Sequence, residues 1–174
     1  MRRFLSAGIL SLSCLMAAPV AAIAQSISLN LAGGLALPTG SFGDINDAGY
    51  TLAAGLGMGA PAMPLRFRAE VMFDEFNHKS PISGTSRAAG VTGNAIYDFS
   101  VAPGGPLTPY AIGGIGFYST RVANGASSDT NLGWNLGGGL RIPLSGFSTY
   151  VEARYHSVSS VSVAFLPIVF GISF

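Results

Sequence analysis

Residues 165–174 read FLPIVFGISF, and this stretch decides how the rest of the chain is interpreted. Counted back from the last residue, every second side chain is apolar: Phe174, Ile172, Phe170, Ile168 and Leu166. A period of two is the signature of a β-strand with one apolar face. The last residues of most soluble domains fray unless something ties them down. The stretch therefore predicts a terminal strand that is paired within a sheet.

The composition is typical of a protein in or near a membrane. Hydrophobic residues make up 49% of the 174 residues, and charged residues only 10%, against about 25% in ordinary soluble domains. Lys and Arg number 9 and Asp and Glu number 8, so the net charge is +1. A chain without a basic surplus is not expected to bind nucleic acid. The length suits one domain with its own core.

The first residues have the pattern of an export signal. Arg2 and Arg3 precede an apolar run, and Ala22-Ile23-Ala24 forms an A-x-A cleavage motif before Gln25. We expect residues 1–24 to be a helical signal peptide that is removed, which leaves 25–174 as one domain. A lipoprotein signal at Cys14 fits less well, because Ser11 stands where leucine is expected. Cys14 is the only cysteine, so the mature chain can form no disulfide.

The mature chain contains eight segments with strand alternation, separated by turn residues. No other stretch has the ~20 apolar residues of a membrane helix. In hydrocarbon, only a closed barrel would then satisfy the backbone hydrogen bonds. The sequence predicts an all-β fold, an eight-stranded antiparallel up-and-down transmembrane β-barrel, with strands near 26–37, 50–59, 65–76, 88–101, 108–121, 132–142, 147–156 and 163–174.

The two faces of these segments favour lipid outside and a small polar lumen inside. One face is continuous Leu, Val, Ile and Phe, and the other is mostly Ser, Asn, Gly and Ala with scattered charges. Soluble barrels and secreted sandwiches also alternate, but their water-facing side is normally rich in Lys and Glu. Segment 108–121 is apolar on both faces, so its parity stays open. Aromatic residues near strand ends suggest interfacial girdles: Tyr97, Phe99, Tyr110, Trp134, Phe147 and Tyr155.

The connections indicate which end of the barrel faces outward. APAMP, APGGPL and PLSG, after the second, fourth and sixth segments, are short. PTGSFGDINDAG, NHKSPISGTSR and VANGASSDTN, after the first, third and fifth, are longer and more polar. Short periplasmic turns and long outer loops are typical of outer-membrane barrels. An even strand number then places both termini on the periplasmic side.

Four stretches resemble a known family: PTGSFGD in the first long loop, NAIYDF, TPYAIGGIGFY, and YVEARYHS followed by FLPIVFGISF. Their order and the terminal phenylalanine are similar to the outer membrane protein beta-barrel domain family, which includes the small eight-stranded barrels related to OmpA, OmpX and opacity proteins. The resemblance implies a bacterial outer-membrane location, with contact to lipid and lipopolysaccharide. It also implies that the barrel-assembly machinery reads the last strand, through Phe170, Ile172 and Phe174. It implies little about function, which varies on one fold.

Candidates for catalysis and metal binding are weak. His156 lies beside Ser157 and Ser159, and Glu152 is a candidate to orient the histidine, but a serine hydrolase needs nucleophile, base and acid in mutual reach. DINDAG places Asp44, Asn46 and Gly49 at calcium-loop offsets, yet no glutamate closes the loop at Gly55. An Asx-type turn is the better interpretation. We therefore expect no enzyme activity, cofactor or metal.

Charges on the inward faces predict a plugged lumen. An eight-stranded ring leaves an interior that side chains can fill, so a conducting channel is the less favoured hypothesis. We expect an ion-pair network across the lumen that involves Arg66, Arg68, Glu70, Asp74, Asp98, Arg141, Glu152 and Arg154. The sequence thus predicts a non-enzymatic barrel that is structural or interacts through its outer loops, whose ligand it does not specify. The alternative is a barrel that handles lipid or a small ligand, which includes the case of a lipid A-modifying enzyme.

Overall fold

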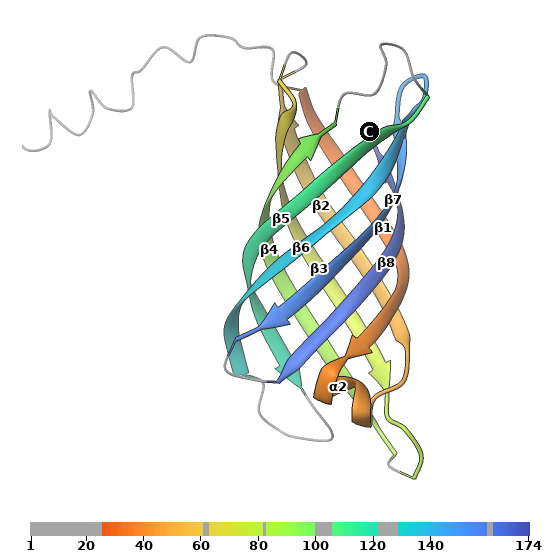
Figure 1. The fold of residues 1–174 in the computed structure, drawn as a ribbon, viewed down its shortest axis with the longest axis vertical. Helices are drawn as coiled ribbons and strands as arrows, with labels where there is room; N and C mark the ends of the chain where they lie inside the picture. The colour runs from red at the N-terminus through yellow and green to blue at the C-terminus, as the bar shows by residue number, and fades with distance from the viewer. Residues whose placement is uncertain (1–25, 61–62, 82, 100–105, 122–128, 160–161) are drawn as a thin grey trace, which may run out of the picture.

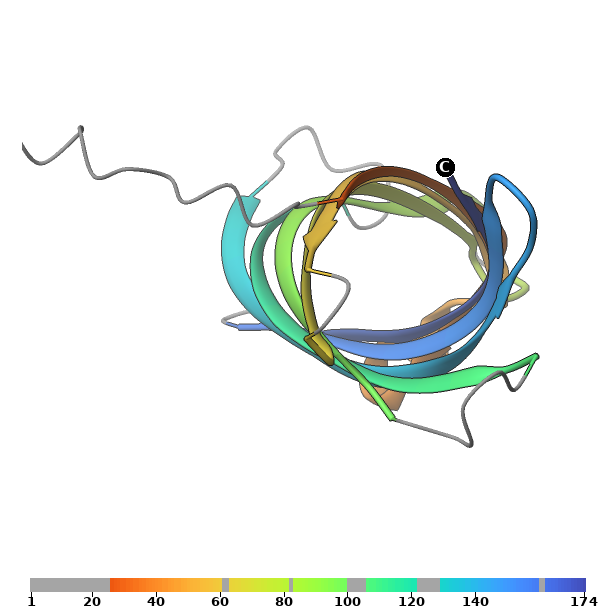
Figure 2. The same cartoon turned by 90° about the horizontal axis from the view of Figure 1, so that it is seen from above.

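The computed structural model describes residues 26–60, 63–81, 83–99, 106–121, 129–159 and 162–174. Within them, eight antiparallel strands close into one barrel (Figures 1 and 2). The strands are β1 Ser26–Thr39, β2 Gly49–Gly59, β3 Leu65–Asn77, β4 Thr85–Asp98, β5 Thr108–Arg121, β6 Asp129–Pro143, β7 Ser148–Val158 and β8 Val163–Ser173. The predicted fold class is confirmed, while the predicted signal peptide lies outside the described residues. No described helix is long and apolar enough to cross a bilayer.

The terminal stretch closes the barrel. β8 pairs antiparallel with β1, from Thr39↔Ala164 to Asn30↔Ser173. The pairing continues through Phe174, whose amide donates to the Leu29 carbonyl at 2.9 Å and whose carbonyl accepts from the Leu29 amide at 3.0 Å. The ring therefore has no free sheet edge, which in a bilayer would leave backbone groups without partners.

Side chains alternate between lumen and outer wall as the period of two requires. On β3, Arg68 and Glu70 are buried, whereas Phe67 and Val71 are 51% and 55% exposed. β8 behaves likewise, with Val169 buried and Phe170 exposed. The exposed hydrophobic side chains form a continuous outer surface, as expected of a wall that faces lipid.

The structure settles the parity of β5 and corrects one aromatic assignment. Ile115 and Phe117 face outward, at 65% and 63% exposure, whereas Ile112 and Tyr118 are buried in the lumen. Tyr110 shares their parity and is only 5% exposed. The prediction that Tyr110 belongs to a lipid-facing girdle is therefore wrong, because its strand places it inside.

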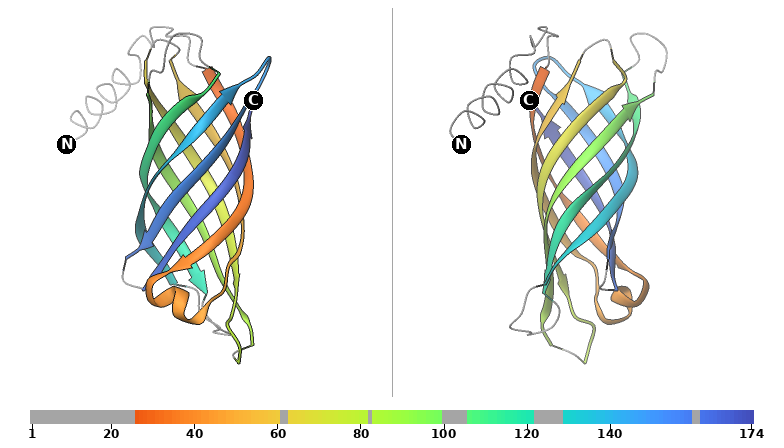
Figure 3. Two further views of the ribbon diagram at one scale, coloured as in Figure 1. Left: turned by 45° about the vertical axis from the view of Figure 1, so that its right-hand side comes forward. Right: turned by 90° about the vertical axis from the view of Figure 1, so that its left-hand side faces the viewer.

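The two ends of the barrel differ less than the sequence indicated. At one end of the barrel β1 begins, β8 ends, and β2, β4 and β6 end; at the opposite end β1, β3, β5 and β7 end (Figure 3). We name these the turn end and the loop end. β4 begins at Thr85 and ends at Asp98 rather than spanning 88–101. The connection within NHKSPISGTSR is thus shortened to residues 78–84, and 99–107 is no shorter than the loop 40–48.

The loop between β1 and β2 contains a short helix that the sequence did not reveal. This helix, α2, spans Gly40–Ile45 and lies across the loop end of the barrel (Figure 1). Its Phe42 is buried, with its ring centroid 5.1 Å from that of Phe76 on β3. Phe76 in turn contacts Phe165 on β8 at 5.6 Å. The helix therefore packs an apolar side chain onto the end of the lumen core that lies nearest to it.

Three tyrosines fill space that glycines leave open on neighbouring strands. A Cβ at Gly171 would lie 2.1 Å from Cζ of Tyr150, and a Cβ at Gly139 would lie 2.5 Å from Oη of Tyr110. Tyr118 lies between Gly90 and Gly133, where added Cβ atoms would come within 2.9 and 2.7 Å of its ring. Each ring thus lies flat against a strand, which lets a narrow lumen hold large side chains.

Candidate functional site

The middle of the lumen holds four charged side chains that we call the central charge ring: Arg68, Glu70, Glu152 and Arg154. Nη2 of Arg68 lies 2.7 Å from both carboxylate oxygens of Glu152. Nε of Arg154 lies 2.7 Å from Oε1 of Glu152. Glu70 accepts from Nη2 of Arg154, and its Oε2 lies 3.2 Å from Nε of Arg68. Each guanidinium thus contacts both carboxylates, and the ring is electrically neutral.

Two strands on opposite sides of the barrel build this ring. Arg68 and Glu70 come from β3, and Glu152 and Arg154 from β7. The two members of each pair are two positions apart along their strand, so both point inward. None of the four is more than 4% exposed. Charges at such depth persist only when they are paired, and every member of the ring has an oppositely charged partner within 4 Å.

Two tyrosines support the ring, and the sequence analysis gave neither of them this role. Oη of Tyr110 donates to Oε2 of Glu152 at 2.7 Å. The guanidinium of Arg68 lies 5.5 Å from the ring centroid of Tyr150, within cation–π range. The sequence signal that could have identified Tyr150 was its inward position in the alternation of β7, because a buried phenol needs a polar partner.

A second ion-pair group, which we call the mouth cluster, lies in the lumen near the turn end. Arg66 holds Asp98 with two bonds, from Nε to Oδ2 at 2.7 Å and from Nη2 to Oδ1 at 2.8 Å. Nη2 of Arg141 donates to Oδ2 of Asp98 at 3.0 Å. The three side chains are 26%, 15% and 22% exposed. One carboxylate therefore serves two guanidiniums, and water reaches the cluster.

Asp74 is the one inward charge that joins neither group. It is fully buried on β3, and neither carboxylate oxygen has a hydrogen-bond partner among the described residues. Its cross-strand neighbour on β2 is Thr51. The predicted eight-residue network is therefore divided in the structure: four residues in the ring, three in the mouth cluster, and Asp74 apart.

The residues considered for catalysis are not assembled into a catalytic group. His156 is fully buried, its Nδ1 lies 2.9 Å from Oη of Tyr118, and its ring stacks on Phe165 at 5.1 Å. Ser157 follows it on the opposite face of β7, where no hydroxyl–imidazole contact can form. Glu152 is engaged by the central charge ring. The geometry thus gives His156 a packing environment rather than a nucleophile.

The DINDAG stretch forms the end of α2 rather than a cation loop. Nδ2 of Asn46 donates to the Phe42 carbonyl at 2.9 Å, so the amide holds the last turn of the helix. This bond reaches four residues back, which differs from the Asx-type turn that the sequence indicated. In the part of the chain that the structure describes, no three His, Cys, Asp or Glu side chains gather as a metal site.

The outer wall carries the three side chains of the predicted assembly signal. Phe170 and Phe174 are 55% and 59% exposed, and Ile172 lies between them on the same face. The ring of Phe174 lies 6.2 Å from that of Phe147. The three residues thus form an apolar row beside the β1–β8 seam.

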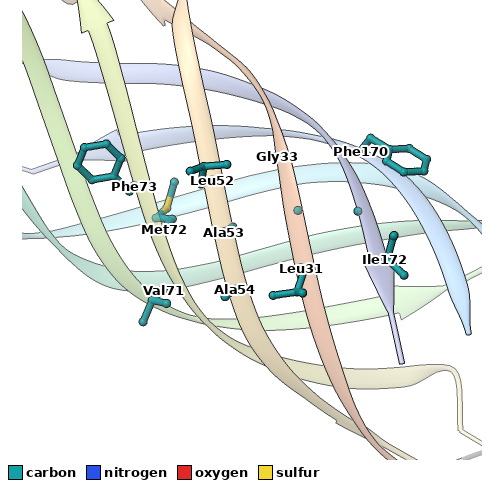
Figure 4. Close-up of a pocket in the computed structure, with 12 residues that line it drawn as sticks. Leu31, Gly33, Leu52, Ala53, Ala54, Val71, Met72, Phe73, Phe170 and Ile172 are labelled. Carbon is teal, nitrogen blue, oxygen red and sulfur yellow. The ribbon is translucent and has the colours of Figure 1, made fainter.

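A shallow apolar depression of about 590 Å³ lies on the outer wall across β8, β1, β2 and β3. Large side chains border it and small ones, including Gly33 and Ala54, line its floor (Figure 4). The bordering side chains are all apolar, which suits contact with lipid tails.

The family comparison decides the identity of the fold. The model of the outer membrane protein beta-barrel domain matches residues 8–174. The chain belongs to this family. It is therefore a protein of the bacterial outer membrane, and its exposed apolar wall is the surface that the bilayer covers.

Solved structures agree with the family assignment at the level of the fold. Neisserial surface protein A (NspA) is 20% identical, with 86% of this chain and 97% of that chain covered and a TM-score of 0.68. OprG from Pseudomonas aeruginosa is 12% identical, with 86% and 97% covered and a TM-score of 0.57. The outer membrane enzyme PagL is 17% identical, with 84% and 98% covered and a TM-score of 0.51. In a direct sequence comparison, no curated protein matches the chain. At these identities the likeness concerns architecture alone.

Proposed function

We propose that this protein is a non-enzymatic outer-membrane barrel with a plugged lumen, which acts structurally or by binding through its loop end. The central charge ring is the observation that carries the proposal. Its four side chains cross the lumen and are no more than 4% exposed, which supports a lumen closed to water at that level. An apolar group lies on the loop-end side of the ring, and it includes Phe42, Phe76 and Phe165.

A conductance measurement tests the plug. The refolded barrel, inserted into a planar lipid bilayer, is expected to give no steady ion current. The double variant Glu152→Ala with Arg154→Ala removes one side of the ring and is expected to conduct more than the parent chain. Steady current steps from the parent chain would refute the plug.

Lipid A analysis tests the non-enzymatic part of the proposal. NspA and OprG share the fold, and so does the enzyme PagL, so the fold decides nothing about catalysis. The separation of His156 and Ser157 onto opposite faces of β7 supports the proposal. We expect identical lipid A mass spectra from cells with and without the gene. A species lacking an acyl chain, found only in cells with the gene, would favour a lipid A-modifying enzyme instead.

We infer further that both termini face the periplasm and that the loop end contacts lipopolysaccharide and the exterior. The helix α2 and the polar loops at one end support this orientation. The mature chain has no cysteine, so single cysteines can be introduced at Ser41 in α2 and at Ser145 in the turn 144–147, both exposed. A membrane-impermeant maleimide should label the first variant in intact cells and the second only after lysis. The reverse pattern would invert the barrel.

Recognition of the last strand by the barrel-assembly machinery is part of the same proposal. The exposed row of Phe170, Ile172 and Phe174 lies on β8 and at the chain end, beside the pairing of the last strand with β1 that closes the barrel. A synthetic peptide of residues 165–174 should slow assembly of the full chain in a reconstituted assembly assay. A peptide with these three residues replaced by serine should not, and equal inhibition by both would oppose the idea.

A further inference from the structure

The turn end of the barrel contains a pocket of about 330 Å³ that the proposed function does not use. Its polar lining comes from the lumen side and includes Arg66, Arg141 and Ser148. Its apolar lining comes from the outer wall and includes Met58 and Phe174. The pocket thus joins the mouth cluster to the lipid-facing surface, over the rim of the barrel.

The mouth cluster, which borders this pocket, has more guanidiniums than side-chain carboxylates. Asp98 is the one carboxylate in the mouth cluster, and it faces the two guanidiniums of Arg66 and Arg141. The sequences of the connections 60–64, 99–107 and 144–147 contain no charged residue. The mouth cluster therefore carries one more positive than negative side-chain charge, and the terminal carboxylate of Phe174, a residue that lines the pocket, offsets this excess. The central charge ring has no such excess.

The guanidiniums in the pocket have donors to spare. The bonds to Asp98 occupy Nε and Nη2 of Arg66 but only Nη2 of Arg141. A guanidinium offers five N–H donors in a planar fork, and an oxyanion is the partner that matches this fork best. Arg141 is 22% exposed, so a ligand can reach it from outside the barrel.

We propose that this pocket binds a phosphate group, with Arg141 as the main donor and Arg66 as the second. Phosphate oxygens accept two parallel bonds from one guanidinium, and Ser148 adds a hydroxyl on the same side. The apolar rim favours a phosphate that carries acyl chains, because the chains would continue along the outer wall beside Met58 and Phe174. A lipid headgroup and free inorganic phosphate share this chemistry.

Native mass spectrometry of the full chain in a neutral detergent tests the site. The barrel is titrated with dihexanoyl phosphatidylglycerol in one arm and with inorganic phosphate in the other. Arg141→Gln should weaken binding about tenfold, the size expected for the loss of a charge-assisted hydrogen bond. The matched control is Arg87→Gln at the loop end, where Arg87 already pairs with Glu75, and its binding should equal that of the parent chain.

The two arms identify the source of the phosphate. If Arg141→Gln weakens binding of the lipid alone, the pocket is assigned to a lipid headgroup. If it weakens binding of inorganic phosphate alone, the pocket is assigned to a soluble phosphate. Loss in both arms supports the phosphate site itself. Arg141→Lys keeps the charge but lacks the planar fork of donors, so its affinity should fall between those of the parent chain and Arg141→Gln. It replaces the glutamine variant in the test if that variant does not fold. Equal binding by the parent and the Arg141 variants, or equal loss in Arg87→Gln, would overturn the proposal.

Discussion

Glu152→Gln is the substitution that tests the central charge ring most directly. Glu152 is 1% exposed, forms ion pairs with Arg68 and Arg154, and accepts a hydrogen bond from Tyr110. The glutamine has the same shape but no charge, so two guanidiniums would then face the single carboxylate of Glu70. The ring would change from neutral to a net charge of +1. Removing one partner of a buried ion pair costs about 3–5 kcal/mol, and we expect a loss of that size in the free energy of unfolding.

A second substitution in the same ring should recover part of that loss. Adding Arg154→Met restores neutrality, because Arg68 and Glu70 remain as a pair at 3.2 Å. The double variant should therefore lose less than the sum of the two single losses, by about 0.5–3 kcal/mol. The matched control is Glu75→Gln, whose partner Arg87 lies 2.5 Å away at the exposed loop end. An exposed pair of this kind contributes only about 0–1 kcal/mol.

Urea unfolding of the refolded barrel in detergent measures these differences. If the single losses at Glu152 and Arg154 fall below ~1 kcal/mol, as for an exposed pair, the lumen is hydrated and the plug must be abandoned. If the losses are large but fully additive, each charge is stabilised separately and the four residues do not act as a ring.

Three further predictions concern single positions. Phe174→Asp should reduce outer-membrane assembly, measured by heat-dependent gel migration, far more than Ser173→Asp, because only the former faces lipid; equal loss would mean that the parity is wrong. Asp74→Asn should leave the free energy of unfolding unchanged or raise it by about 1–3 kcal/mol, because it removes a buried charge that has no hydrogen-bond partner. A clear fall in the free energy of unfolding, measured with urea, would show that the carboxylate has a stabilising partner. Gly34→Ala should destabilise the barrel, because its Cβ would lie 2.0 Å from a β8 carbonyl oxygen, whereas Gly93→Ala, with nothing within 4 Å, should not. Similar unfolding midpoints for the two glycine variants would contradict this reasoning.

The sequence was sufficient for the fold because a lipid-facing barrel imposes one rule on every strand. One face of each strand must be continuously apolar toward lipid, and a one-residue error would reverse a whole strand. On β3 and β7 this rule also places Arg68 near Glu152 and Glu70 near Arg154, once the strands are counted from the same end. The structure has these contacts at 2.7 Å and closer.

The features that the sequence did not reveal depend on shape rather than on period. β5 has apolar residues on both faces, so the inward position of Tyr110 depends on space left by Gly139 on β6. The helix α2 is only six residues long, and its place depends on the contact of Phe42 with Phe76. Neither contact leaves a repeat in the sequence, because each joins one residue to one site on another element.

The fit of tyrosines against glycines has a consequence for how this barrel can change during evolution. A larger residue at Gly171 has room only if Tyr150 has already become smaller, and a smaller residue at 150 leaves a void beside the glycine. The size of Tyr118 is constrained in the same way by two positions, Gly90 and Gly133. The lumen can therefore be remodelled only by paired substitutions on neighbouring strands. Homologues that lose one of these tyrosines should have exchanged the facing glycine as well.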